Sequence, residues 1–240
     1  MIGWRTRMIR AVLFDMGGTL DGDGLHWLDR FARLYAEAGV PLPRETLVAA
    51  FDDAERRAAT DEAIATADLD AMIDRHVGWQ LAHLSMDDAE LRRALVAGFV
   101  RPIRELAAAN AGLLAGLNAR GLRLGVVSNG CGNVDVLCDD LGYAPFLSLI
   151  VDSRRVGLFK PDPAIYLYAA HSLGLPSWSI MMVGDSFDRD IRPAKTIGMQ
   201  TAWLEGPVER LCPEPAIADL RLRALTDLSG ALEARGRTDA

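Results

Sequence analysis

The chain has 240 residues, of which half are apolar and a quarter are charged, and its formal net charge is −7. This length allows one full-sized domain with a modest insertion and a well-buried core. The acidic balance argues against nucleic acid as the main partner. No apolar run approaches the roughly 20 residues that a membrane-spanning helix needs, so we expect no membrane partner.

The N-terminus contains no apolar stretch long enough for a signal peptide, so we expect a cytoplasmic location. Three cysteines are present, and their spacing matches no zinc pattern. We expect them to be reduced and mostly packed thiols. Nothing in the sequence indicates the oligomeric state.

A short apolar strand is predicted over residues 9–14, directly before Asp15. Residues 25–104 are poor in strand formers, and their apolar residues recur at helical spacing. About four helices are predicted there, with one break at Pro41 and Pro43. After Asn110 the pattern changes to strands over 122–127, 148–151, 180–183 and 199–204, with helices over 110–120, 131–141, 163–173, 187–197 and 226–235.

Strands that alternate with helices predict an α/β fold with a parallel sheet covered on both faces. The long helical stretch interrupts this alternation after the first strand. We therefore expect an all-helical cap domain over residues 23–104, inserted into a core domain formed by 8–22 and 105–240. The linkers near 21–25 and 101–108 are the expected hinges of the cap.

Ligands of such sheets bind beyond the carboxyl ends of the strands, and polar residues gather at these positions. The first group is Asp15, followed by a turn in which Gly17 and Gly18 let the chain come close to a ligand. A second group, Ser128 and Asn129, offers a hydroxyl and an amide for phosphate oxygens. Gly18 and Thr19 are further candidates for phosphate contacts.

The remaining groups are Lys160, which precedes Pro161, and the segment after the fourth strand, which contains Asp185 and Asp190. Carboxylates that share a site repel one another unless a cation lies between them. Oxygen ligands with a lysine nearby favour Mg²⁺ over softer metals. Such a site suits phosphoryl transfer, because a carboxylate can attack a phosphoryl group and form an aspartyl-phosphate.

In their type and order, these four groups resemble the motifs of the haloacid dehalogenase superfamily. The resemblance covers roughly residues 8–22 and 105–235, and it implies a Rossmann-like core with a mobile helical cap of the C1 type. It further implies that Asp15 is the nucleophile, that Ser128 donates to phosphate oxygens and that Lys160 orients the nucleophile and balances charge. The implied Mg²⁺ ligands are Asp15, the backbone carbonyl of Gly17, Asp185 and Asp190.

One position departs from the phosphatases of this superfamily, which usually carry a second aspartate two residues after the nucleophile. That aspartate is the general acid and base, and Gly17 stands in its place. General acid–base catalysis contributes about 10²–10⁴-fold, so we expect slow turnover. Asp21 is the best candidate for a substitute, ahead of Asp23 and His26.

The leading functional hypothesis is a Mg²⁺-dependent phosphatase that acts on a small phosphorylated metabolite. A 2-haloacid dehalogenase is an alternative, because such enzymes also lack the second aspartate. A catalytically degenerate protein that binds phosphate or a partner is another. Substrate choice is expected to depend on the cap, where His26 and Trp27 are better candidates for contacts than Arg56, Arg57, His76, Trp79 or His83.

Overall fold

A computed structural model describes residues 8–206, 211–212, 214 and 216–238. Within these residues, six strands form one sheet in the order β3-β2-β1-β4-β5-β6, and every neighbouring pair is parallel. The α/β fold with a Rossmann-like parallel sheet is therefore confirmed. The strands are β1 (Ala11–Phe14), β2 (Arg123–Ser128), β3 (Leu147–Asp152), β4 (Ile180–Gly184), β5 (Gln200–Leu204) and β6 (Leu220–Leu222).

The first strand lies in the middle of the sheet and is buried on both faces. Val12 and Phe14 belong to the larger core cluster, whereas Ala11 and Leu13 belong to a second cluster on the other face. All four side chains are fully buried, which explains why the strand reads as a continuous apolar run rather than an alternating one. The helices that follow β2 are α5 (Val134–Asp140), α6 (Ser153–Val156), α7 (Ala164–Ser172), α8 (Arg192–Thr196) and α9 (Asp227–Thr238).

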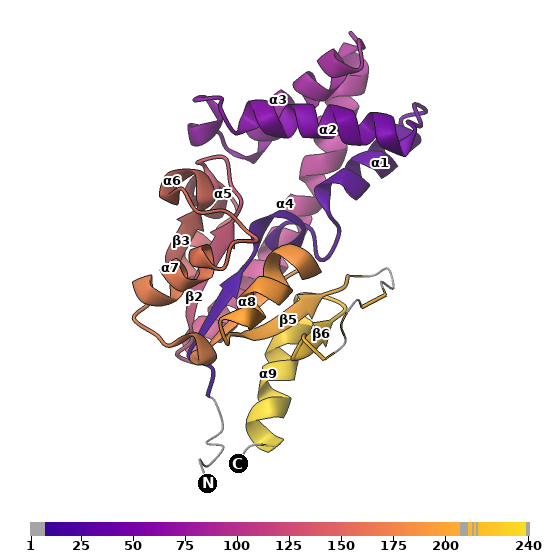
Figure 1. Ribbon diagram of the computed structural model, residues 1–240. Coiled ribbons are helices and arrows are strands. Elements are labelled where there is room, and N and C mark those ends of the chain that lie inside the picture. The colour runs from indigo at the N-terminus through magenta and orange to yellow at the C-terminus, as the bar shows by residue number, and fades with distance from the viewer. Residues whose placement is uncertain (1–7, 207–210, 213, 215, 239–240) are drawn as a thin grey trace.

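The segment between β1 and β2 is helical, as the periodicity predicts. Its helices are α1 (Trp27–Glu37), α2 (Arg44–Ala58), α3 (Leu69–His83) and α4 (Ala89–Ala119). Figure 1 shows α1, α2, α3 and the start of α4 grouped beyond one end of the sheet, on the side away from both termini. We call residues 23–104 the helical insertion. It lies where the carboxyl ends of the strands point, so it faces the ligand-binding edge of the sheet.

The fourth helix differs from the sequence-based expectation. The sequence predicts a linker near 101–108 and a separate helix over 110–120, but α4 runs without interruption from Ala89 to Ala119 and contains Pro102. Residues 105–119 are rich in alanine and leucine, the strongest helix formers, and they extend the helix past the proline. The predicted boundary between 104 and 105 thus falls inside a helix, and the division into cap and core stays a prediction.

The other expected hinge, near 21–25, is closely packed. The N–H of Gly24 donates to the carbonyl of Gly18 (2.7 Å), and the N–H of Leu225 donates to the Asp23 carboxylate (2.6 Å). A Cβ on Gly24 would lie 2.3 Å from the Cα of Gly206. These contacts tie the start of the insertion to the core.

No helix in the described part of the chain is long and apolar enough to cross a membrane.

Candidate active site

The strand order brings the polar segments of the sequence together. β1 pairs with β2 on one side and with β4 on the other, so Asp15, Ser128 and Asp185 lie at the carboxyl ends of three adjacent strands. The direction of the strand order reverses beside β1, and α/β sheets bind ligands at such a switch point. The N–H of Asp15 donates to the carbonyl of Val183 (2.9 Å), which holds the start of the turn against β4.

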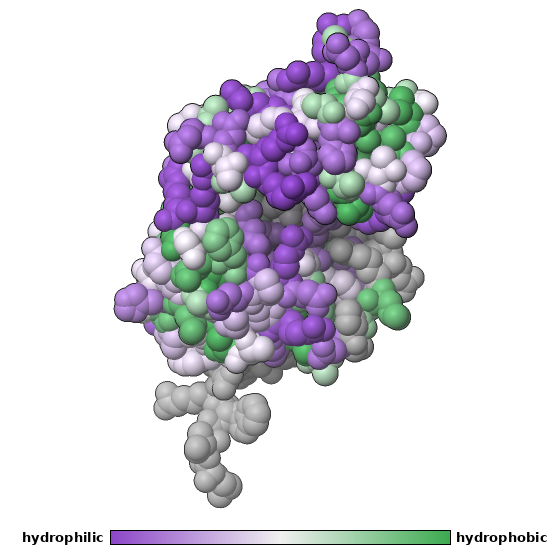
Figure 2. Space-filling model, turned by 45° about the horizontal axis from the view of Figure 1, so that its top comes forward, coloured by the Kyte–Doolittle hydropathy of each residue, from purple (hydrophilic) through white to green (hydrophobic). Residues whose placement is uncertain are grey.

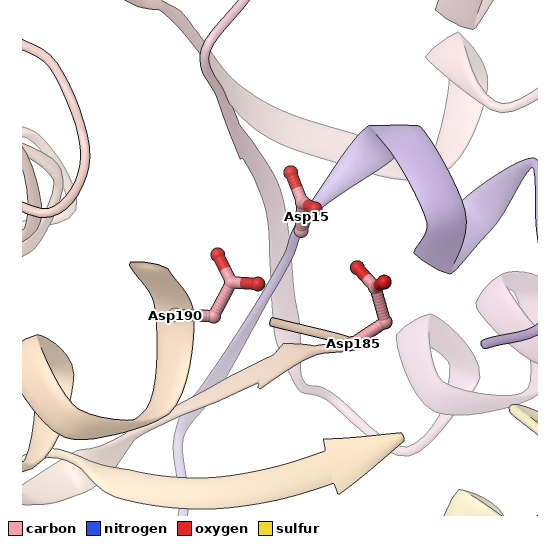
Figure 3. Close-up of side chains that lie close together, drawn as sticks. All are labelled: Asp15, Asp185 and Asp190. Carbon is pink, nitrogen blue, oxygen red and sulfur yellow. The ribbon is translucent and has the colours of Figure 1, made fainter. Parts of the chain in front are cut away.

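Three aspartates converge at this point. Oxygen atoms of Asp15, Asp185 and Asp190 all lie within 4.8 Å of one another, and all three residues are buried. Figure 3 shows the three carboxylates pointing into one space, from the end of β1, the end of β4 and the helical turn Phe187–Ile191. Buried carboxylates at this spacing repel one another unless cations compensate them. An all-oxygen donor set of this kind fits a hard divalent cation.

Lys160 supplies one positive charge to this cluster. Its Nζ donates to Asp15 Oδ1 (2.6 Å) and to Asp190 Oδ1 (2.7 Å), and the side chain is almost fully buried. Burial alone would lower the pKa of Lys160, but the charges of Asp15 and Asp190 outweigh it and the pKa is raised. Lys160 is therefore protonated at neutral pH and holds the Asp15 carboxylate in place.

Asn129 positions the lysine through its backbone. The Asn129 amide donates to the carbonyl of Lys160 (2.9 Å), and its Oδ1 accepts from the N–H of Lys160 (2.8 Å). Both ends of the amide are thus engaged with one residue. As a direct phosphate ligand, Asn129 stays a prediction, but its contacts assign it a role in orienting Lys160.

Thr19 has a similar bracing role toward Asp185. Its Oγ1 accepts from the N–H of Asp185 (3.1 Å), and the residue is fully buried. Trp203 donates from Nε1 to the carbonyl of Asp185 (3.0 Å). The N–H of Gly18 is already bonded to Asp21 Oδ1 (2.6 Å). Neither Gly18 nor Thr19 lines the cavity described next, so the structure gives their predicted phosphate contacts no support.

A cavity of about 250 Å³ lies between the helical insertion and the core. Asp15, Gly17, Ser128, Asn129 and Lys160 line it on the core side, and no hydrogen bond to the Ser128 hydroxyl is found among the described residues. Figure 2 shows hydrophilic residues gathered along the boundary between insertion and core. The cavity thus places the predicted nucleophile, lysine and hydroxyl around one volume.

Asp21, the predicted substitute acid, lies behind this cavity and does not line it. Its two oxygens accept from the N–H of Gly18 and from Trp27 Nε1 (2.8 Å). Burial raises the pKa of Asp21 to about 6, although the charge of Arg30 opposes the shift. Its contacts make Asp21 a structural support for the turn and for Trp27. A direct role in proton transfer stays a prediction that the geometry does not favour.

The insertion contributes six lining residues, and the sequence pointed to only two of them, His26 and Trp27. Arg56 and Arg57 instead pair with Asp53 on the exposed side of α2. The lining residues that sequence reasoning missed are Phe51, Asp52, Glu55 and Met72 from the insertion, and Met16, Cys131, Asn133, Val134, Leu137 and Arg189 from the core. A helical pattern alone does not tell which face of a cap helix meets the core.

This fold and site define an α/β protein with buried carboxylates at the switch point of a parallel sheet, and comparison with known proteins assigns its family. The family model for haloacid dehalogenase-like hydrolases matches residues 9–198. The chain therefore belongs to the haloacid dehalogenase-like hydrolases, and it is an enzyme of the hydrolase class.

Three individual relatives share about a third or less of their residues with this chain over the aligned regions. A phosphoserine phosphatase of Thermus thermophilus is 33% identical over 118 residues, which is 48% of this chain and 46% of that protein. The chain thus spans about half the length of such curated relatives. An N-acetylmuramic acid 6-phosphate phosphatase of Pseudomonas putida is 29% identical over 197 residues, covering 81% and 82% of the two chains. A solved dehalogenase structure shares the fold with a TM-score of 0.65 at 19% identity, covering 93% and 96%.

Proposed function

We propose that this hydrolase is a Mg²⁺-dependent phosphatase that acts on a small phosphorylated metabolite through an aspartyl-phosphate on Asp15. The observation that carries the proposal is the buried cluster of Asp15, Asp185 and Asp190 around Lys160. Buried carboxylates this close to one another repel, and a divalent cation among them would relieve the repulsion. The relatives named as phosphatases also support a phosphatase function.

The residues then have separate tasks. Asp15 Oδ attacks phosphorus, the bond from phosphorus to the substrate's alcohol oxygen breaks, and that oxygen leaves as the alcohol with a proton from water. A water molecule then attacks the same phosphorus, which releases phosphate and frees Asp15. Lys160 and the Ser128 hydroxyl bind the phosphoryl oxygens, while Asp190 holds Lys160 from the other side. Asp15, Asp185, Asp190 and the carbonyl of Gly17 would hold Mg²⁺, which when bound withdraws charge from the phosphoryl group.

The insertion is proposed to act as a cap domain over residues 23–104. It supplies part of the cavity wall opposite Asp15, so it limits the size of the alcohol group and shields the aspartyl-phosphate from bulk water. The core of 8–22 and 105–240 carries the phosphate-handling residues.

The test is hydrolysis of p-nitrophenyl phosphate with Mg²⁺ and with EDTA, by wild type and Asp15→Asn. We expect wild-type hydrolysis that EDTA stops, and a loss of at least about 10³-fold in Asp15→Asn, because the nucleophile is gone. Asp188→Asn is the matched control, since this exposed acid in the same loop as Asp190 pairs with Arg192 and does not line the cavity. Full metal-dependent activity in Asp15→Asn would refute the proposal.

A 2-haloacid dehalogenase is the second candidate, favoured by Gly17 and by the fold shared with a solved dehalogenase. The aspartate cluster speaks against it, because displacement of a halide from carbon needs no divalent cation. Halide release from 2-chloropropionate that is unaffected by EDTA, without phosphatase activity, would favour this alternative.

A further inference from the structure

The wall that the insertion contributes to the cavity is acidic and aromatic. Within residues 23–104, all of which the structure describes, the lining residues are His26, Trp27, Phe51, Asp52, Glu55 and Met72. No lysine or arginine of the insertion is among them. Burial, followed by the charge of the core residue Arg189, lowers the pKa of His26, so this histidine adds no positive charge at neutral pH.

Glu55 is held in place by a chain of buried polar groups. Gln80 Nε2 lies 2.8 Å from His76 Nδ1, and His76 Nε2 lies 2.9 Å from Glu55 Oε1. An amide nitrogen can only donate, so in this arrangement Nδ1 accepts from Gln80 and Nε2 donates to Glu55. His76 and Gln80 are fully buried, whereas the Glu55 side chain is 42% exposed and lines the cavity. This hydrogen-bonded chain orients the Glu55 carboxylate at the cavity wall.

Two further acceptors face the cavity, Asn133 from the core and Asp52 from the insertion. Asn133 is 1% exposed and lines the cavity, and its Nδ2 donates to the carbonyl of Ala67 (2.9 Å), but its Oδ1 has no hydrogen-bond partner. Asp52 makes no ion pair with any described residue. Arg189, a core cation that lines the cavity together with Lys160, lies against His26 Nε2 (3.0 Å). A ligand group that fits this wall therefore carries hydrogen-bond donors and positive charge.

An ammonium group has these properties. It donates three hydrogen bonds, accepts none and binds favourably against aromatic rings such as those of Trp27 and Phe51. Carboxylate-bearing ligands, which include 2-haloacids, would be repelled by Glu55 and Asp52. Burial of the polar side chains of His76 and Gln80 inside a small helical insertion costs free energy. Binding of a substrate by the Glu55 carboxylate, which they orient, explains why they are there.

We propose that the substrate is a phosphomonoester whose alcohol group carries an ammonium, and that this ammonium binds Glu55. The proposal rests on the phosphatase function proposed above and specifies its substrate class. The core side of the cavity binds the phosphate, and the insertion side binds the cation. Glu55 is then the residue that determines specificity.

The test compares kcat/KM for O-phosphoethanolamine and propyl phosphate, which have the same number of non-hydrogen atoms in the alcohol and differ in charge. The ammonium also makes the alcohol a better leaving group, whichever enzyme is used. We therefore compare the ratio of the two kcat/KM values between wild type and each variant. We expect wild type to prefer O-phosphoethanolamine, and Glu55→Gln to reduce the preference about 10- to 100-fold, the usual worth of a hydrogen bond between charged groups. Glutamine can still accept from His76, and a general loss of activity cancels in the ratio.

Glu45→Gln is the control, because Glu45 is an exposed residue of the same helix that does not line the cavity. It should keep the wild-type ratio. An unchanged ratio in Glu55→Gln would overturn the substrate proposal while p-nitrophenyl phosphate hydrolysis leaves the phosphatase function standing. Absence of metal-dependent hydrolysis of all three phosphates would overturn both.

Discussion

At the scale of single residues, Gly17 stands where the proposed reaction would use a general acid. Its backbone angles are φ −70° and ψ 117°, which any residue adopts, and a Cβ there would meet only Trp27 Nε1, at 3.7 Å. The turn therefore does not require glycine for steric reasons. What is missing is a carboxyl group that could protonate the leaving alcohol.

Gly17→Asp should therefore fold. It should speed the hydrolysis of alkyl phosphates by about tenfold or more, because general acid–base catalysis usually contributes about 10²–10⁴-fold. The effect should be smaller for p-nitrophenyl phosphate, whose leaving group needs no proton. Gly17→Asn is the matched control because it adds similar volume without an acid. Equal rates in the two variants would show that another group already supplies the proton.

Asp21 makes the stability of the protein depend on pH. Burial raises its pKa from 3.8 to about 6, so the folded state holds its proton more tightly than the unfolded state. The stability that this group contributes is present below about pH 4 and is lost as the pH rises through about 6. From the size of the shift, the free energy of unfolding of wild type relative to Asp21→Asn should fall by about 1–3 kcal/mol between pH 4 and pH 7.

Urea unfolding at a series of pH values measures this difference. Asp87→Asn serves as the control, since Asp87 is exposed and this variant removes a carboxylate at the surface instead of a buried one. A pH-independent difference for Asp21→Asn would mean that Asp21 titrates normally in the folded state.

The sequence is most informative for residues that directly follow strands. Parallel strands end at one edge, so the sequence pattern alone predicts that Asp15, Asp185 and Asp190 meet there. The contacts of Lys160 are only implied by the family resemblance. No motif specifies the directions of side chains. The sequence therefore does not predict the contact of Thr19 with Asp185, the two hydrogen bonds of Asn129 to Lys160, or the position of Glu55.

At the scale of elements, the loop between α2 and α3 connects the insertion to the core. Arg154, in α6, donates from one nitrogen to the carbonyl of Asp61 in this loop (3.1 Å) and to the carbonyl of Cys131 in the core (2.8 Å). Asn133 reaches the carbonyl of Ala67 in the same segment. This loop is thus attached to the core by a few polar contacts.

Arg154→Ala should loosen this attachment. We expect amide hydrogen exchange in residues 61–67 to become about tenfold faster, in line with the loss of charge-assisted hydrogen bonds, and exchange in β1 and β4 to stay unchanged. Arg155→Ala is a close control, because the neighbouring guanidinium bonds only to Gly132 and Asp135 of the core among the described residues. Equal exchange in the two variants would show that Arg154 does not hold the loop.

Element boundaries show the limits of sequence patterns. Apolar runs predict five of the strands but not β6. Its three residues, Leu-Arg-Leu, are too few for a strand pattern to be distinguished from chance. The predicted linker near 101–108 divides α4, and Pro102 within it disfavours a continuous helix. A proline in a long helix is tolerated where the residues on both sides pack well, and Phe99 and Ile103 are fully buried.

At the scale of the whole molecule, the proposed function divides between two parts: the core binds the phosphate, and the insertion binds the rest of the substrate. The type of sheet is predictable from the sequence, since strands and helices alternate along the chain after residue 110. The insertion faces the edge of the sheet where the nucleophile is proposed to lie, as Figure 1 shows, so one cavity takes residues from both parts. How the insertion and the core fit together depends on contacts between distant segments, such as Leu69 with Asp140, that no local pattern reveals.

The most direct measurement of the proposed chemistry is acid quenching of wild type during turnover of a phosphate ester with Mg²⁺, followed by mass spectrometry of the peptide that contains Asp15. We predict a phosphoryl group on Asp15, which forms with Mg²⁺ and is absent when EDTA replaces the metal. Rapid turnover with no phosphoryl group on that peptide, or with the group on another residue, would contradict the proposed role of Asp15.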